Sequence, residues 1–323
     1  MDRLPLIAVV AALTLAGSGI ADDTAAVARR DAEWLAALRR SREALEWSDV
    51  AVRHDWRLQE RPKDGRSRIL DPDDATIREG SPAECRAAFA ALEAEGTIPA
   101  LHGPAVIVLH GLGEGRASMR PLAEHLRDTL DAAVLLVGYA STSADLEAHG
   151  RMLGQVIATL PDNTRVSFVG HSLGNLVVRR WMTLAHRDDL ARVDRVVMLG
   201  PPNRGSDLAR SVAGVGALAA LAEGAARDLV IHWRQVEPHL AVPPCEFGIV
   251  AGGRGDDAGF SPFLVGDDDA VVRVEETRLD GADDFLLLPV HHAAMLRDPA
   301  VQRATATFLR AGRFARDVDE APR

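Results

Sequence analysis

Ser172 lies in a pattern that is typical of a catalytic nucleophile. Residues 170–174 read Gly-His-Ser-Leu-Gly, which fits the nucleophile elbow G-x-S-x-G, where a strand turns sharply into a helix. The turn raises the serine hydroxyl above the sheet, and side chains at the two flanking positions would collide with it, which explains the glycines. The pattern predicts that Ser172 attacks a carbonyl carbon, with an ordinary glycine turn as the alternative interpretation.

A serine hydroxyl reacts well only when a base removes its proton and a carboxylate orients that base. The expected chain order is serine, acid, histidine. We select His292 as the base and keep His291 as the alternative, because both follow the last apolar strand. We select Asp269 as the acid, because it precedes a small residue and an apolar pair, and keep Asp268 and Asp267 open. A solvated loop and a calcium site are the other interpretations of this acidic run.

The reaction also needs two N–H donors for the oxyanion that develops on the attacked carbonyl. The residue after the nucleophile supplies one, so we predict the N–H of Leu173, where the positive end of a helix dipole faces the same point. The loop after the first central strand reads His110-Gly111-Leu112-Gly113. Its glycines let the backbone approach a substrate closely, which favours the N–H of Leu112, with His110 as a supporting residue. A plain tight turn is the alternative.

Apolar segments alternate with helical segments from residue 104 onward. We expect strands over residues 105–109, 133–137, 166–169, 193–199, 247–250 and 285–290, and helices over 119–130, 146–160, from 173 and over 300–309. Continuous apolar strands between amphipathic helices imply a parallel sheet that is covered on both faces. The sequence therefore predicts an α/β fold over residues 101–311, with a mostly parallel sheet flanked by helices and the candidate residues at the carboxyl ends of its strands.

Two further regions carry no motif of their own. Residues 22–100 are predicted to form an N-terminal helical and hairpin extension that packs on the main domain: a helix over 23–47, a hairpin over 54–70 and a helix from Pro82. Residues 312–323 are predicted to be a loose tail. The extension has no assigned role beyond packing.

Residues 206–229 lie between two predicted strands and are rich in alanine, leucine, valine and glycine. We predict a small helical cap that binds acyl chains over the pocket and contacts a membrane surface. A helix packed in the core is the alternative interpretation.

The composition limits the class of protein. The chain has 323 residues, 47% of them hydrophobic, and a net charge of −10 without a basic run, which argues against nucleic-acid binding. Cys85 and Cys245 either form a disulfide or remain separate thiols, and neither has the spacing of a metal ligand. We assign no metal and no cofactor.

The first residues resemble an export signal. Residues 4–16 are apolar after Arg3, and Gly19-Ile20-Ala21 offers the small residues of a cleavage site. We predict that residues 1–21 are removed after Ala21 and that the protein is periplasmic or secreted. An uncleaved N-terminal anchor is the alternative.

The ordered set of motifs resembles the α/β-hydrolase superfamily, and within it the bacterial lipase- and esterase-like serine hydrolases. The resemblance spans residues 104–299 and rests on segments 110–113, 139–142, 170–174, 199–206 and 292–295 together with Asp269. Two departures stand out. The acid is followed by Ala270 where glycine is usual, which keeps Asp267 and Asp268 open, and two alanines follow His292.

The resemblance implies a serine hydrolase that cleaves carboxylic esters, often of lipids, through an acyl-enzyme and without a cofactor. The expected partner is a small-molecule or lipid ester. An acyltransferase or an amidase with the same three residues is one alternative. A non-catalytic exported binding protein on the same fold is another.

Overall fold

The computed structural model describes residues 45–208, 224–230 and 232–315. Its main sheet has six strands in the order β10-β9-β8-β7-β5-β6, and every neighbouring pair is parallel. The strands are β5 (Ala105–Leu109), β6 (Ala133–Val137), β7 (Val166–His171), β8 (Val193–Leu199), β9 (Glu246–Gly252) and β10 (Asp284–Leu288). The six strands and the parallel sheet predicted from the sequence are confirmed.

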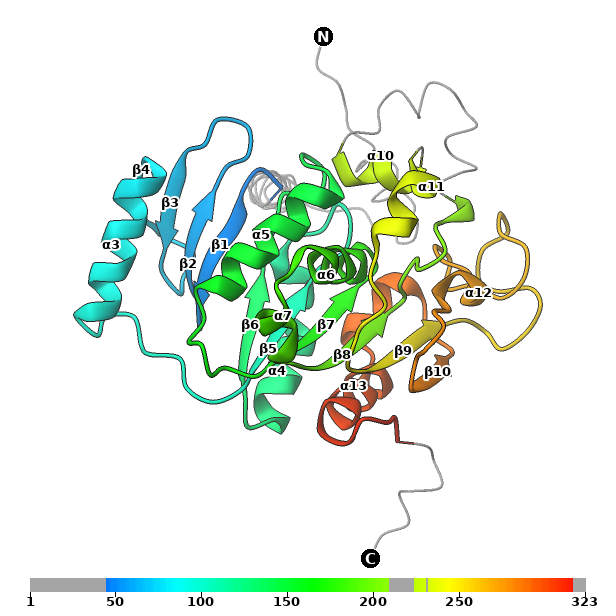
Figure 1. The fold of residues 1–323 in the computed structure, drawn as a ribbon. Coiled ribbons are helices and arrows are strands. Elements are labelled where there is room, and N and C mark those ends of the chain that lie inside the picture. The colour runs from blue at the N-terminus through cyan, green and yellow to red at the C-terminus, as the bar shows by residue number, and fades with distance from the viewer. Residues whose placement is uncertain (1–44, 209–223, 231, 316–323) are drawn as a thin grey trace, which may run out of the picture.

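Helices cover both faces of this sheet, as Figure 1 shows. Strand β5 is buried along its whole length: Ala105, Ile107 and Leu109 pack in one apolar cluster with α5 (Leu146–Ala158) and α6 (Leu173–Leu184). Val106 and Val108 pack in the other cluster with α4 (Arg120–Thr129) and α13 (Pro299–Ala311). Apolar residues at every position, rather than at alternate ones, are what a strand between two helical layers needs.

Shorter helices lie in the connections between the larger elements. They are η1 (Arg116–Met119), α7 (Arg187–Ala191), α10 (Gly224–Val230), α11 (Trp233–Val236), η2 (Glu237–His239), α12 (Val274–Thr277) and η3 (His292–Arg297).

The described part of the N-terminal extension, residues 45–100, contains a four-stranded antiparallel sheet and a helix beside β6 (Figure 1). It contains β1 (Ser48–Arg53), β2 (Trp56–Glu60), β3 (Ser67–Leu70), β4 (Thr76–Gly80) and α3 (Pro82–Ala94). The predicted hairpin is confirmed as β2 and β3. The helix from Pro82 is also confirmed, and Ser81 and Glu84 form a capping box at its start.

The helix predicted over residues 23–47 falls mainly outside the described residues, but its last part is wrong. Residues 45 and 46 form a turn, and β1 begins at Ser48. Strand β1 is buried at all six positions, but it contains the charged residues Asp49 and Arg53. Its sequence therefore lacks the continuous apolar run by which a buried strand is predicted.

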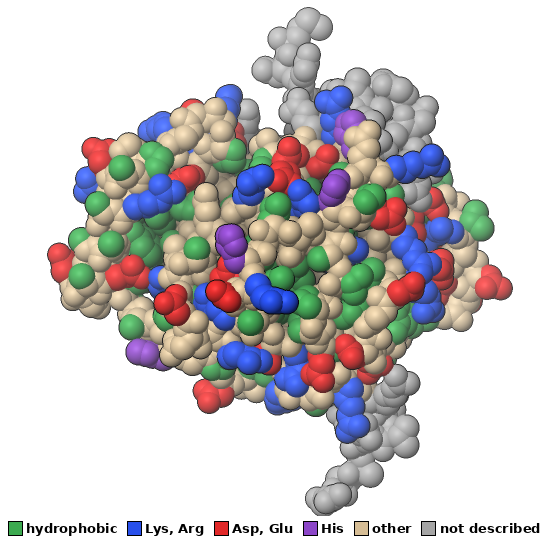
Figure 2. Space-filling model, in the orientation of Figure 1, with side chains coloured by type: hydrophobic (Ala, Val, Ile, Leu, Met, Phe, Trp, Pro, Cys, Tyr) green, Lys and Arg blue, Asp and Glu red, His purple; other side chains and the backbone are tan. Residues whose placement is uncertain are grey.

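Other expectations have mixed outcomes. Cys85 and Cys245 are free thiols, so the disulfide is not formed. Residues 209–223 of the predicted cap, the export signal and the end of the tail lie outside the described residues. Within the described ranges we find no helix with the length and apolar character that a bilayer crossing needs. On the face drawn in Figure 2, the described acidic and basic side chains intermingle rather than gather by sign.

Candidate active site

The nucleophile elbow has the predicted strand–turn–helix geometry. Strand β7 ends at His171, α6 begins at Leu173, and Ser172 between them has φ 52° and ψ −120°, which is strained for a residue with a side chain. A Cβ at Gly170 would lie 2.7 Å from the Asn175 nitrogen, and one at Gly174 would lie 2.6 Å from the Leu109 carbonyl oxygen. Gly170 is therefore required by the turn itself, and Gly174 by the close approach of the end of β5.

The structure brings the selected base and acid together. His292 Nδ1 lies 2.6 Å from Asp269 Oδ2, and the His292 backbone N–H donates to the Asp269 carbonyl. The other carboxylate oxygen accepts hydrogen bonds from the N–H groups of Val271 (3.0 Å) and Val272 (2.7 Å). Burial opposes the imidazolium, but the adjacent carboxylate outweighs it and raises the pKa of His292 above its usual value. The pair is arranged so that Nδ1–H donates and Nε2 stays available.

The alternative acids have other partners. Asp268 is fully buried, and its Oδ1 accepts hydrogen bonds from the N–H groups of Ser261 and Ala270. Asp267 accepts hydrogen bonds from the N–H groups of Arg254 and Gly255. Both carboxylates fix the loop, and neither makes a hydrogen bond to histidine among the described residues.

Two details explain the remaining ambiguities. His291 is exposed and its ring packs on Phe260, with centroids 3.9 Å apart, so the two adjacent histidines face different surroundings. Ala270 has φ 83°, in the left-handed region where glycine is usual. The departure Asp269-Ala270 thus keeps the backbone shape of an Asp-Gly turn.

Contacts around Gly200 and His171 show that the elbow and the histidine share one edge of the sheet. Gly200 follows β8, and a Cβ there would lie 3.0 Å from His292 Cε1 and 3.2 Å from Asp269 Oδ2. The ring of His171, next to Ser172, lies 4.6 Å from the His292 ring between centroids. Among the described residues the Ser172 hydroxyl makes no hydrogen bond; such contacts are often long before substrate binds.

Residues 110–114, which we name the β5 loop, approach the elbow closely. A Cβ at Gly111 would lie 3.2 Å from Ser172 Cβ. The N–H of Gly111 donates to Glu114 Oε2 (3.1 Å) and that of Gly113 donates to Ser141 Oγ (3.1 Å). Within the described part of the chain, the intervening N–H of Leu112 makes no hydrogen bond. It is available for a substrate oxygen.

The second predicted donor is available for a different reason. Leu173 is the first residue of α6, so its N–H has no acceptor within the helix. Among the described residues, neither of the two N–H groups named from the sequence, Leu112 and Leu173, has a competing acceptor.

The sequence analysis missed Glu114 and gave no role to His171. His171 Nε2 lies 3.2 Å from the His292 carbonyl oxygen, and Nδ1 lies 3.4 Å from Glu114 Oε2. Burial of Glu114 opposes its ionisation, but the nearby His171 ring and the N–H of Gly111 outweigh it and hold the pKa of this carboxyl well below its usual range. The only sequence signal for His171 was its place inside the elbow motif.

His110 supports the β5 loop from inside. It is fully buried, and burial lowers its pKa, which favours the neutral ring. Nε2 accepts the N–H of Tyr139 (3.2 Å), so the proton belongs on Nδ1, which donates to the Gly111 carbonyl (2.9 Å). His110 thus lies where it can support the β5 loop, as the sequence analysis expected.

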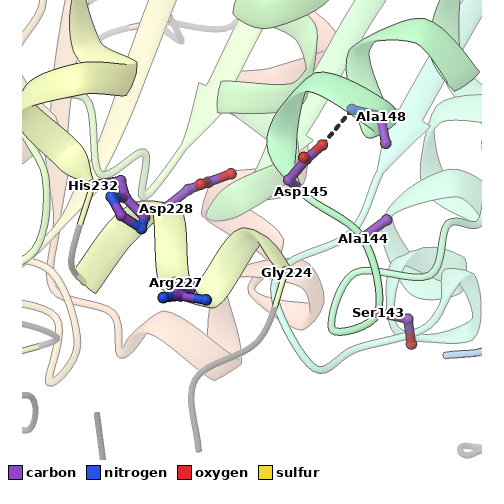
Figure 3. Close-up of a pocket in the computed structure, with 8 residues that line it drawn as sticks. All are labelled: Ser143, Ala144, Asp145, Ala148, Gly224, Arg227, Asp228 and His232. Atoms are coloured by element: carbon purple, nitrogen blue, oxygen red, sulfur yellow. Dashed lines mark hydrogen bonds between the residues drawn. The ribbon is translucent and has the colours of Figure 1, made fainter. Parts of the chain in front are cut away.

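A cavity of about 440 Å³ lies between α10 and the start of α5 (Figure 3). Its walls are Ser143, Ala144, Asp145, Ala148, Gly224, Arg227, Asp228 and His232. None of these is Ser172, Asp269 or His292, so the cavity does not contain the site.

Comparison with known proteins agrees with this geometry. Residues 104–200 match the model of the family described as "Putative serine esterase (DUF676)". That range holds the β5 loop and the elbow but ends before the acid and the histidine. The Bacillus licheniformis lipase BlEst2 in its mature form is similar in structure, with a TM-score of 0.53 and 19% identity over 67% of this chain and 96% of that chain. The chain is an α/β-hydrolase by fold.

The propeptide form of the same lipase gives a TM-score of 0.53 and 18% identity, over 68% of this chain and 53% of that chain. No curated protein matches the sequence. The predicted fold class is confirmed, and the family match supports an ester hydrolase.

Proposed function

We propose that the protein is a serine hydrolase that cleaves carboxylic esters, with Ser172 as nucleophile, His292 as general base and Asp269 as the acid that orients it. One observation carries this proposal. His292 Nδ1 lies 2.6 Å from Asp269 Oδ2, and the His292 carbonyl oxygen lies 3.2 Å from Nε2 of His171, the residue directly before Ser172. The match to a serine esterase family supports the same chemistry.

In the proposed reaction, His292 Nε2 takes the Ser172 proton while Oγ bonds to the ester carbonyl carbon. The carbonyl oxygen becomes an oxyanion that accepts hydrogen bonds from the N–H groups of Leu112 and Leu173. His292 then gives its proton to the alcohol oxygen as the C–O bond breaks, which leaves an acyl-enzyme. Water loses a proton to His292, attacks the acyl carbon and releases the acid as Ser172 recovers its proton.

Asp269 acts throughout by orientation and charge. Its carboxylate holds Nδ1–H, so Nε2 faces the nucleophile as an acceptor, and it stabilises the imidazolium that forms in each half-reaction. A carboxylate that is itself held by two backbone N–H groups keeps this orientation at little cost in entropy.

Acyl or lipid esters are the substrates that we propose. The apolar character of residues 206–229 supports them, as a cap over the acyl chain that would also contact a membrane surface. Export after cleavage near Ala21 would bring the enzyme to such substrates outside the cytoplasm.

The test is hydrolysis of p-nitrophenyl esters with short and long acyl chains by the chain from Asp22 onward. Ser172→Ala and His292→Ala should each lower kcat by roughly 10³-fold or more, whereas His291→Ala, in the adjacent exposed position, should keep most of the activity. A fluorophosphonate should label the wild type and not Ser172→Ala. Unchanged turnover by Ser172→Ala would refute the proposal.

Two further readouts separate the alternatives. Ester products that form when an alcohol is added would indicate an acyltransferase, because alcohol and water compete for the same acyl-enzyme. Absence of both turnover and fluorophosphonate labelling would favour a binding protein that keeps the fold without the reaction.

A further inference from the structure

Strand β1 of the N-terminal sheet contacts the segment that follows β6. We name residues 138–143 the β6 loop. The Asp49 N–H donates to the Gly138 carbonyl (2.9 Å), and the Gly138 N–H donates back to Asp49 Oδ2 (2.7 Å). The Ala140 N–H donates to Ser48 Oγ (3.1 Å). Asp49 is fully buried and Ser48 nearly so, so two N–H groups of the loop depend on side chains of β1.

The Asp49 carboxylate is held rigidly by β2. Arg57 Nη1 donates to Asp49 Oδ2 (2.8 Å) and also to the Leu136 carbonyl (2.5 Å), while Gln59 Nε2 donates to Asp49 Oδ1 (2.8 Å). The ion pair is completely buried on both sides. Charge-assisted hydrogen bonds of this kind are shorter and stronger than neutral ones, so the loop is tied to a fixed point.

The β6 loop in turn contacts the β5 loop at two places. The Tyr139 hydroxyl donates to the His110 carbonyl (2.6 Å), and the two rings stack with centroids 4.2 Å apart. Ser141 Oγ accepts the Gly113 N–H (3.1 Å). Tyr139, Ser141 and His110 are all fully buried. These contacts fix the residues on either side of Leu112.

We propose that strand β1 is a positioning element of the active site: through the β6 loop, Ser48 and Asp49 position the Leu112 N–H that holds the oxyanion. The inference rests on the proposed function. Ser48 and Asp49 are positioning residues, since they act through Gly138, Ala140 and the β5 loop and do not touch the substrate.

The magnitude follows from the sensitivity of oxyanion binding to distance. Loss of one oxyanion donor costs roughly 10²- to 10³-fold in kcat, and a displacement of about 1 Å can cost about 10²-fold. Ser48→Ala removes one of the ties and leaves the Asp49 ties in place, so we expect a smaller loss of kcat of roughly 10-fold. KM should change little, because the donor binds the oxyanion more strongly than the ground-state carbonyl.

The test compares Ser48→Ala with Ser48→Thr, which keeps the hydroxyl, and with Ile69→Val. Ile69 is fully buried in β3 and packs in the separate apolar cluster of the N-terminal sheet. The assay measures kcat and KM for p-nitrophenyl butyrate and Ki for a trifluoromethyl ketone, whose serine adduct places an oxyanion at the same point. Thermal melts establish that each variant is folded at the assay temperature.

The expected result is a kcat that falls in Ser48→Ala with a matching rise in Ki, recovers in Ser48→Thr and stays near wild type in Ile69→Val. Ser143→Ala gives a second measure at an exposed position, because Ser143 Oγ donates to the Leu45 carbonyl (3.1 Å) and ties the loop to the turn that precedes β1. A smaller loss in the same direction is expected there.

Unchanged kcat and Ki in both serine-to-alanine variants would overturn the inference, as would an equal loss in Ile69→Val or a change in KM alone. These outcomes leave the proposed function standing. A wild-type protein that neither turns over the ester nor reacts with a fluorophosphonate would remove the function itself, and the inference with it.

Discussion

Asp269→Asn tests the proposed site most directly, because the hydrogen-bond partners of Asp269 determine which way the asparagine amide must point. Asp269 Oδ1 accepts N–H groups from Val271 and Val272, and Oδ2 faces His292 Nδ1. An asparagine must place its oxygen toward the two N–H donors, since its NH₂ group accepts nothing. The NH₂ group then points at Nδ1 and donates to it.

That orientation forces the wrong tautomer on the histidine. With Nδ1 as an acceptor, the His292 proton moves to Nε2, which can no longer take the proton of Ser172. The backbone bond from the His292 N–H to the Asp269 carbonyl remains, so the ring stays in place and the fold is kept. A comparable change in a Ser-His-Asp site costs about 10⁴-fold in kcat, which is about 5 kcal/mol in the activation free energy.

The assay is kcat/KM for p-nitrophenyl butyrate, measured beside Asp267→Asn. The control removes a carboxylate two residues away whose partners are the N–H groups of Arg254 and Gly255. It should retain far more activity than Asp269→Asn, because the asparagine oxygen still accepts one of the two N–H groups and His292 keeps its carboxylate partner. Retention of more than a tenth of the activity by Asp269→Asn, or an equal loss in Asp267→Asn, would refute the reasoning.

Further outcomes follow from the pKa of His292 and from the packing at Gly174. Hydrolysis requires neutral His292, whose pKa is raised above the ordinary 6.5, so kcat/KM should fall as the pH drops through a value above 6.5; the pH–rate profile checks this, and a midpoint below 6.5 would contradict it. The free energy of unfolding depends on pH in the opposite direction. The ion pair of protonated His292 with Asp269 stabilises the fold below pH 6.5, and this stabilisation is lost as the pH rises through the pKa of His292 in the folded state. Gly174→Ala should lower the free energy of unfolding by about 3 kcal/mol or more, because its Cβ would lie 2.6 Å from the Leu109 carbonyl oxygen. Gly154→Ala in α5, with its nearest neighbour at 3.4 Å, should change it by less than about 1 kcal/mol in either direction, and denaturant titrations of the two variants would compare them.

The central strands of the main sheet were predictable because they are covered on both faces. A strand such as β5 must be apolar at every position, and that pattern survives in the sequence without knowledge of its neighbours. Strands β1 and β4 are not apolar at every position. Residues 76–80 of β4 are exposed or only partly buried, and β1 buries charged groups whose partners come from β2 and the β6 loop. Hydrogen bonds between polar groups that are far apart in the chain produce no periodic pattern of apolar residues in the sequence.

The candidate site likewise contains residues that the sequence predicted and residues that it left open. Ser172 and the two N–H donors follow from short motifs whose geometry is local. The choice among three consecutive aspartates was open, because only the path of the folded loop decides which carboxylate meets the histidine. The backbone at Ala270, at φ 83°, turns the chain directly after Asp269. An alanine in that conformation is uncommon, so the sequence pattern pointed away from the turn that the structure contains.

The parallel sheet explains why residues so far apart in the chain meet. The carboxyl ends of parallel strands lie along one edge, so the β5 loop, the elbow after β7 and Gly200 after β8 converge there from separate segments. Strand β6 stands at the end of the sheet, and its loop would have fewer supports than the others without a further element. The N-terminal sheet supplies that element, since β1 provides the acceptors for Gly138 and Ala140. Strand β1 therefore supports the loop of an edge strand, which is the support that our proposed positioning of the Leu112 N–H requires.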